Sequence, residues 1–197
     1  TRGASVSSTY TAQEWAGMSL QERSVAEKSR GDELLQAKNS HHAAVAYMQS
    51  QLLLMEHVGM VLRRNSNDSG GETLVETEAQ TMLASVAKLL KFVARLFTNS
   101  ELPREASAAY ACCAVAQMMF VRARMDHYDL LRKDVSSGKG GEKDTEDMMG
   151  GVNSMFDAMR SYESAVKCNP ADTPLPNWAV VSADEACRVV RDQFLNV

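Results

Sequence analysis

Residues Ala106–Val121 read ASAAYACCAVAQMMFV, and this stretch decides the fold. It contains no charged residue, and only Ser107 and Gln117 are clearly polar. At about 3.6 residues per turn its apolar side chains point all around the axis, and a helix without a polar face must be enclosed. The stretch is shorter than the roughly 20 apolar residues that a bilayer requires, and Glu105 and Arg122 bound it. We therefore expect a central helix that is enclosed by other parts of the protein.

The composition indicates a globular protein that is not dedicated to nucleic acid. The chain has 197 residues, of which 45% are hydrophobic, and this is enough for one domain with a real core, or for one domain and a satellite element. Its net charge of −4 is the opposite of the basic balance that is typical of nucleic-acid-binding domains. Four cysteines are too few for a disulfide framework in a chain of this size, so we expect a reducing compartment, cytosol or nucleus.

The first residues, TRGASVSSTYTAQEW, are weakly patterned and rich in serine and threonine. They include neither the apolar run of a secretory signal nor an initiator methionine. We therefore expect a piece of a longer protein, in which residues 1–18 form a flexible tail.

The sequence from residue 19 onward predicts six helices, including the central one, and no strand. Apolar residues recur at spacings of three and four, and S/T-x-x-E signatures mark helix starts at Ser19, Thr73 and Ser182. The stretch SSGKGGEKDTED at 136–147 has three glycines, dense charge and no apolar residue, so we expect a flexible insert there. The expected helices cover residues 19–38, 41–64, 73–99, 103–134, 145–167 and 182–196.

The predicted fold class is all-α: a tetratricopeptide-like helical bundle of about six helices with a central apolar helix. About two residues join the first two helices, which is typical of an antiparallel hairpin. Residues 19–197 are expected to form a single helical domain that only the insert interrupts.

No motif in the sequence supports an enzyme, a cofactor or a metal site. Cys112 and Cys113 are adjacent, so on a helix they point about 100° apart and do not converge as the ligands of a zinc site do. Buried structural cysteines are the favoured interpretation. The four histidines form no HExxH or Cys/His arrangement, and glycine-rich nucleotide-binding motifs and the hydrolase motif GxSxG are absent. We expect no catalytic, cofactor-binding or metal-binding residue.

Lys88, Lys91 and Arg95 form a basic stripe on the helix expected at 73–99. Such a stripe could bind an acidic peptide or a phosphate backbone. More commonly it is the solvated side of an amphipathic helix, and both interpretations stay open.

The last two expected helices offer more apolar residues than one core needs, because four earlier helices can already enclose Ala106–Val121. These residues either lie wholly on the bundle or meet their equivalents in a second chain. The candidate dimer surface consists of Met155, Phe156, Met159, Val189, Val190 and Phe194.

Several segments resemble, in order, the C-terminal homology domain of AFF-family transcription-elongation scaffold proteins. The run YMQSQLLLME at Tyr47–Glu56 is similar to that domain's YLEAxLxFIE segment. Glu76-Thr77 followed by LLKF at Leu89–Phe92 resembles its ET…LIKF helix, and Cys113–Arg124 resembles its Cys- and Met-rich helix. The run AAYACCAVAQMMFVRA is also similar to the C-terminal helical domain of some plant CW-type zinc-finger proteins.

The resemblance implies a non-catalytic module for homodimerisation, or for heterodimerisation with a paralogue, in a nuclear scaffold protein that regulates transcription. The family's domain carries a long Ser/Pro-rich loop, whereas the insert here is short and glycine-rich. The alternative is a monomeric peptide-binding module, similar to microtubule-interacting-and-trafficking (MIT) or tetratricopeptide domains, in which the hairpin at 26–53 receives a partner helix. Nucleic acid is a weakly supported second class of partner, and no membrane association is expected.

Overall fold

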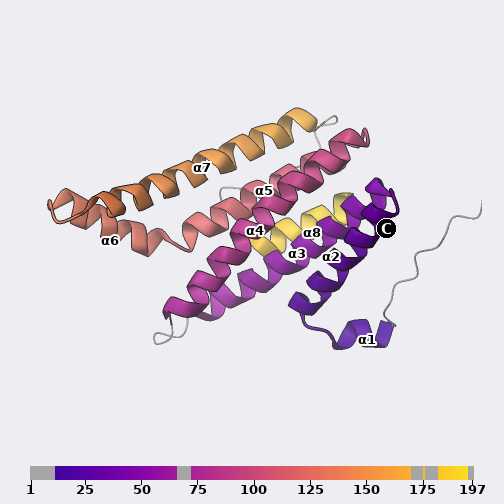
Figure 1. Cartoon of the computed structure of the whole chain (residues 1–197), viewed down its shortest axis with the longest axis horizontal. Helices are drawn as coiled ribbons and strands as arrows, with labels where there is room; N and C mark the ends of the chain where they lie inside the picture. The colour runs from indigo at the N-terminus through magenta and orange to yellow at the C-terminus, as the bar shows by residue number, and fades with distance from the viewer. Residues whose placement is uncertain (1–11, 66–71, 170–174, 176–181, 195–197) are drawn as a thin grey trace, which may run out of the picture.

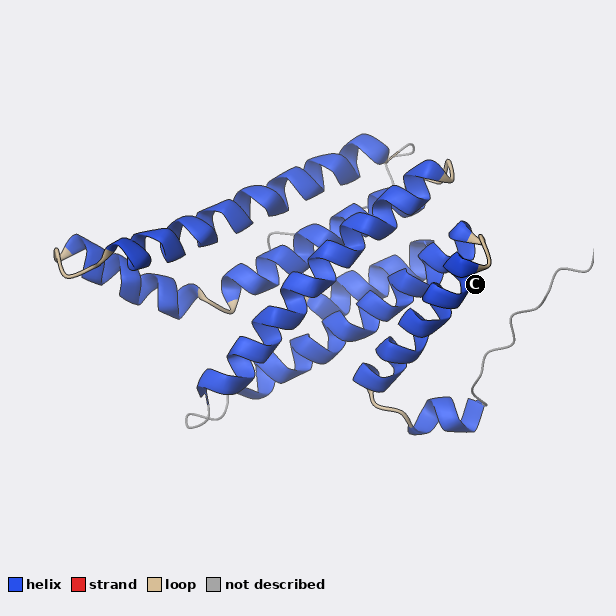
Figure 2. Ribbon diagram, in the orientation of Figure 1, coloured by secondary structure: helices blue, strands red, loops and turns tan. Residues whose placement is uncertain are grey.

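The chain is an all-α protein whose helices pack around the predicted central helix. The computed structural model describes residues 12–65, 72–169, 175 and 182–194 (Figure 1), and these form helices and connecting segments but no strand (Figure 2). The predicted fold class, an all-α helical bundle, is confirmed. The described helices are α1 (Ala12–Gly17), α2 (Leu20–Gln36), α3 (Ser40–Asn65), α4 (Glu72–Asn99), α5 (Pro103–Arg122), α6 (Met125–Ser136), α7 (Glu142–Cys168) and α8 (Ala183–Phe194).

The enclosed helix is α5. From Ala106 to Gln117 every residue except Tyr110 is buried, as the absence of a polar face predicts. α4, α7 and α8 all pack against α5. Figure 1 shows α7 on one side of α5 and α3, α8 and α2 on the other.

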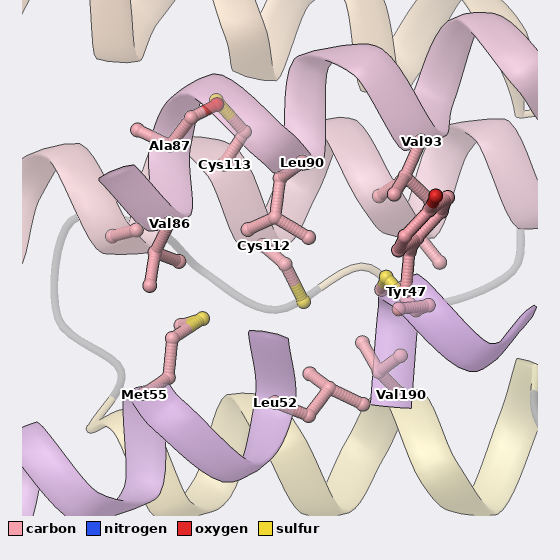
Figure 3. Close-up of a cluster of buried hydrophobic side chains, with 14 of the residues drawn as sticks. Tyr47, Leu52, Met55, Val86, Ala87, Leu90, Val93, Cys112, Cys113 and Val190 are labelled. Carbon is pink, nitrogen blue, oxygen red and sulfur yellow. The ribbon is translucent and has the colours of Figure 1, made fainter. Parts of the chain in front are cut away.

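The core lies where α3, α4, α5 and α8 meet. Cys112 of α5 shares one buried cluster with Leu52 of α3, Leu90 of α4 and Val190 of α8 (Figure 3). All four side chains are fully removed from solvent. α2 packs chiefly against α3, which places it at the edge of the bundle.

The predicted N-terminal tail at 1–18 contains a helix. Residues 12–17 form α1, whereas residues 1–11 lie outside the described part of the chain. α2 then starts with the predicted capping box. The Ser19 amide donates to the Glu22 carboxylate at 2.7 Å, and the Glu22 amide donates to the Ser19 hydroxyl at 3.3 Å.

The single helix predicted at 103–134 is wrong, because this region forms two helices. α5 and α6 are separated by residues 123–124 and bent by 53°. At the bend, the guanidinium carbon of Arg124 lies 5.8 Å from the ring centre of Phe120 and 5.2 Å from that of Tyr128. The bend turns α6 toward α7, with which it forms a hairpin (Figure 1).

Only residues 137–141 of the predicted insert at 136–147 form a turn, because α7 begins earlier than expected, at Glu142. The acidic residues Glu142 and Asp144, whose charge suggested a flexible segment, lie in the first turn of α7. The Asp144 carboxylate accepts a hydrogen bond from the Gly141 amide at 2.8 Å, and acidic residues in a first turn favour the positive end of the helix dipole.

Helices that follow each other in sequence form pairs: α2 packs with α3, α4 with α5 and α6 with α7. The tetratricopeptide-like arrangement of these pairs stays a prediction. Within the described ranges no single helix has the length and hydropathy to cross a membrane, and the bent pair of α5 and α6 passes that test only when the two are taken together.

Candidate protein interface

The inner face of α7 consists of small residues. Its buried positions are Gly151, Ala158, Ser161 and Ala165, and α7 packs along the alanine-rich α5. Near the start of α7, Gly151 faces Tyr128 of α6, since a Cβ at Gly151 would lie 2.5 Å from the Tyr128 Cζ. Small side chains on both helices let the two axes approach closely.

Buried hydrogen bonds fix the position of α7 on α5. The Ser107 hydroxyl donates to the Ala165 carbonyl at 2.7 Å, and the Ser161 hydroxyl donates to Gln117 Oε1 at 3.0 Å. Cys113 Sγ lies 3.6 Å from the same Ser161 hydroxyl. Rotating α7 would leave these buried polar groups without partners, at a cost of about 1–3 kcal/mol each. The opposite face of α7 is therefore held outward.

This outer face carries large hydrophobic side chains. Eleven large hydrophobic residues are exposed in the described part of the chain, and six of them lie on α7. Val152, Phe156 and Met159 follow one another at spacings of four and three and are 42%, 52% and 44% exposed. Such an apolar stripe on a surface typically marks an interaction site. The α7 stripe comprises Met149, Val152, Met155, Phe156, Met159 and Val166.

The structure divides the candidate dimer surface that the sequence suggested. Met155, Phe156 and Met159 are exposed on α7. On α8, Val190 is fully buried and Val189 is half-buried, while the side chain of Phe194 lies outside the described part of the structure. Val190 therefore cannot belong to an exposed surface, and placing it there was wrong.

α8 is a core helix because it fills the space between α3 and α5. Val190 meets the core cluster, and two ion pairs tie α8 to α3: Arg191 with Glu56 and Arg63 with Asp184. An amphipathic pattern alone does not distinguish a helix that completes a core from one that binds a partner.

Sequence reasoning missed three residues of the α7 stripe: Met149, Val152 and Val166. A signal was present, because they continue the spacing of Phe156 and Met159 in both directions. The spacing in the sequence thus covered the whole stripe, but only its middle part was included in the predicted surface.

The basic stripe is not a uniform cationic patch. Lys88 and Arg95 are exposed on α4, whereas Lys91 is half-buried and lies 3.7 Å from the Asp157 carboxylate of α7. Lys91 thus joins α4 to α7, and its charge is partly compensated. Among the three, Lys88 and Arg95 are better placed to meet a ligand.

The adjacent cysteines are structural. Burial raises the pKa of Cys112 to about 12 and that of Cys113 to about 11, so both thiols stay protonated at neutral pH. The Cys113 thiol donates to the Ala87 carbonyl at 3.4 Å. The described residues include no group of three or more His, Cys, Asp or Glu side chains that could hold a metal ion.

A polar hollow of about 660 Å³ lies between α1, α2, α3 and α8. Arg23, Arg30 and Arg191 line it together with Glu27, Glu56 and Asp192, so its lining carries charges of both signs. Burial raises the pKa of Glu27, and Arg30, 3.6 Å away, opposes this shift. The mixture of charges favours no single class of ligand.

Comparison of the chain with protein-family models, with curated proteins and with solved structures gives no match.

Proposed function

We propose that this chain is a non-catalytic protein–protein interaction module that dimerises through the α7 stripe. The observation that carries the proposal is that α7 turns small residues toward the bundle and large hydrophobic residues toward solvent. A helix that served only the core would have the reverse arrangement, because burial of large apolar side chains stabilises most. A partner that packs on the stripe would bury the large hydrophobic side chains that a single copy leaves exposed.

The stripe suits a second copy of the same helix. From Met149 to Val166 it extends over about 25 Å at ~1.5 Å per residue. In an antiparallel pair with a two-fold axis between Phe156 and Met159, each Phe156 faces Met159 of the other copy and each Met149 faces Val166, while Val152 faces the exposed Glu163 near the end of the stripe. One surface then serves both copies, as a two-fold interface requires.

The test is the molar mass of the wild type and of Phe156→Glu, measured by size-exclusion chromatography with light scattering at roughly 100 μM, a concentration that populates a dimer of micromolar dissociation constant. We expect a wild-type dimer and a folded, helical Phe156→Glu monomer, because the interface would have to bury an unpaired carboxylate. Phe156 is 52% exposed, so one copy accommodates the change without unfolding.

Leu130→Glu is the matched control, because Leu130 is an apolar residue of similar exposure on α6, outside the stripe. This variant is expected to remain a dimer. A wild-type monomer, or a Phe156→Glu dimer, contradicts the proposal.

The segments that resemble the AFF-family domain support a finer proposal: the dimer joins two copies, or two paralogues, of a nuclear scaffold that regulates transcription. Two differently tagged copies expressed in one cell are then expected to co-purify from the nuclear fraction. Recovery from the cytosol alone would contradict the nuclear assignment. It would not contradict the dimer, which the light-scattering experiment tests separately.

A further inference from the structure

A second apolar surface, the α2–α4 groove, lies between α2 and α4 with α3 as its floor. Its volume is about 560 Å³. α2 and α4 both pack on α3, and the space between them remains open above it. Large apolar residues, two lysines and several uncharged polar residues line the groove. The apolar residues include Val25, Leu54, Met82, Leu89 and Phe92, and one of the lysines is Lys88.

The floor is set by two small residues. The Ser50 hydroxyl of α3 donates to the Ser24 carbonyl of α2 at 2.8 Å, and the two hydroxyls are 3.2 Å apart. Serine at both positions brings α2 close to α3, and these small side chains leave space above them. Ser24 and Ser50 are both buried, so their hydrogen bonds hold this part of the fold in place.

The walls present apolar side chains to solvent. Val25 on α2 is 61% exposed and Phe92 on α4 is 39% exposed. The Phe92 ring lies 6.0 Å from the ring of Tyr47, whose hydroxyl donates to Asp32 at 2.6 Å. The wall on the α4 side is thus supported by a buried, hydrogen-bonded tyrosine and is preformed.

The charge of the groove is positive although the chain is acidic overall. Its described lining includes Lys28 and Lys88 and no acidic residue. Lys28 forms an ion pair with Asp32 at 3.0 Å, which partly compensates its charge, whereas Lys88 is exposed. Glu78 of α4 lies outside this lining and lines a smaller hollow together with Met82. An approaching ligand therefore meets apolar walls, with the exposed Lys88 on the α4 side and Lys28, in its ion pair with Asp32, on the α2 side.

We propose that the α2–α4 groove binds an amphipathic helix of a partner protein whose apolar stripe is flanked by acidic residues. From Met82 to Phe92 the α4 wall is about 15 Å long, which accommodates two to three turns of helix. Apolar anchors at spacings of three and four would lie between Val25 and Phe92, and the acidic flanks would meet Lys28 and Lys88. This site is separate from the α7 stripe.

The probe is a synthetic helical peptide of about 18 residues with leucines at spacings of three and four and glutamates on both flanks. A second peptide carries lysine in place of every glutamate. By fluorescence anisotropy, we expect the acidic peptide to bind with an affinity that falls with added salt, and the basic peptide to bind at least ~10-fold more weakly.

Two variants and one control locate the site. Val25→Glu is expected to lower the affinity for the acidic peptide at least ~10-fold, and Lys88→Glu at least ~5-fold. Each variant places a negative charge against the glutamates on the peptide's flanks. Lys139→Glu reverses a charge in the exposed α6–α7 turn and is expected to leave the affinity unchanged. Circular dichroism verifies that each variant is folded.

The proposal is overturned if the two peptides bind equally, if neither binds at up to ~1 mM, or if both groove variants retain wild-type affinity. It is also overturned if Val25→Glu lowers the molar mass of a wild-type dimer, because the occupant would then be a second copy of this chain.

Discussion

Glu27 is a carboxyl group that folding removes from water without full compensation. It is 8% exposed, one of its oxygens has no hydrogen-bond partner, and burial raises its pKa despite Arg30. A raised folded-state pKa means that ionised Glu27 opposes folding at neutral pH. The cost is relieved as the pH falls through that pKa.

We therefore expect Glu27→Gln to increase the free energy of unfolding at pH 7, and the increase to shrink toward pH 4.5. Urea denaturation at the two pH values measures both. Glu22→Gln is the control with the opposite sign, because the hydrogen bonds from Ser19 lower the pKa of Glu22. That variant should lose stability at pH 7, and the loss should fade in acid. A destabilised Glu27→Gln at pH 7 would contradict the assignment of the buried carboxyl.

The contact between α2 and α3 depends on one glycine. A Cβ at Gly31 would lie 2.7 Å from two ring atoms of Tyr47. Tyr47 is buried and its hydroxyl is bonded to Asp32, so the ring cannot move aside freely. Glycine here costs helix propensity but permits the close approach of the two helices.

Gly31→Ala is expected to destabilise the protein by about 1–3 kcal/mol, because overpacking outweighs the propensity gain. The control is Gly150→Ala on α7, where an added Cβ meets nothing within 4 Å. That change should stabilise by about 0.5–1 kcal/mol, the usual effect of replacing a helical glycine. Thermal or urea unfolding of both variants compares them, and a stabilised Gly31→Ala would show that α2 and α3 separate easily.

The helices that the sequence predicts best are those whose own pattern of apolar and polar residues determines whether they are buried. The stretch Ala106–Val121 has no polar side, and burial of α5 follows from that alone. The break between α5 and α6 was missed because it serves a distant contact, that of Tyr128 with Gly151, about 20 residues further along. No local breaker such as proline marks it.

The candidate interface was predicted in part for a similar reason. Met155, Phe156 and Met159 show the spacing of an apolar stripe, and the structure exposes them. Val190 shows the same kind of spacing, yet it is buried. The packing of small residues of α7 on α5 and the buried hydrogen bonds between these helices decide which face of α7 points outward, and both join segments far apart in the sequence.

Across the whole molecule, the two proposed surfaces lie on different sides of the central helix. α7 flanks α5 on one side, and α2 lies beyond α3 on the other (Figure 1). A dimer formed through the α7 stripe would therefore leave both α2–α4 grooves open. The arrangement suits a scaffold, in which two copies associate and each presents a site for a further partner.

The antiparallel register of the proposed dimer makes one further prediction. Phe156→Glu and Met159→Lys should each be monomeric alone, because each dimer would bury unpaired charges. Phe156 of one copy faces Met159 of the other in this register, so an equimolar mixture should form a heterodimer with one Glu–Lys pair at its centre. Light scattering of the separate and mixed variants shows whether positions 156 and 159 of opposite copies are coupled, by the logic of a double-mutant cycle. Met149→Lys replaces Met159→Lys in the control mixture, since Met149 faces Val166 instead. Heterodimers in the control mixture, or only monomers in the mixture of Phe156→Glu with Met159→Lys, would rule out this register.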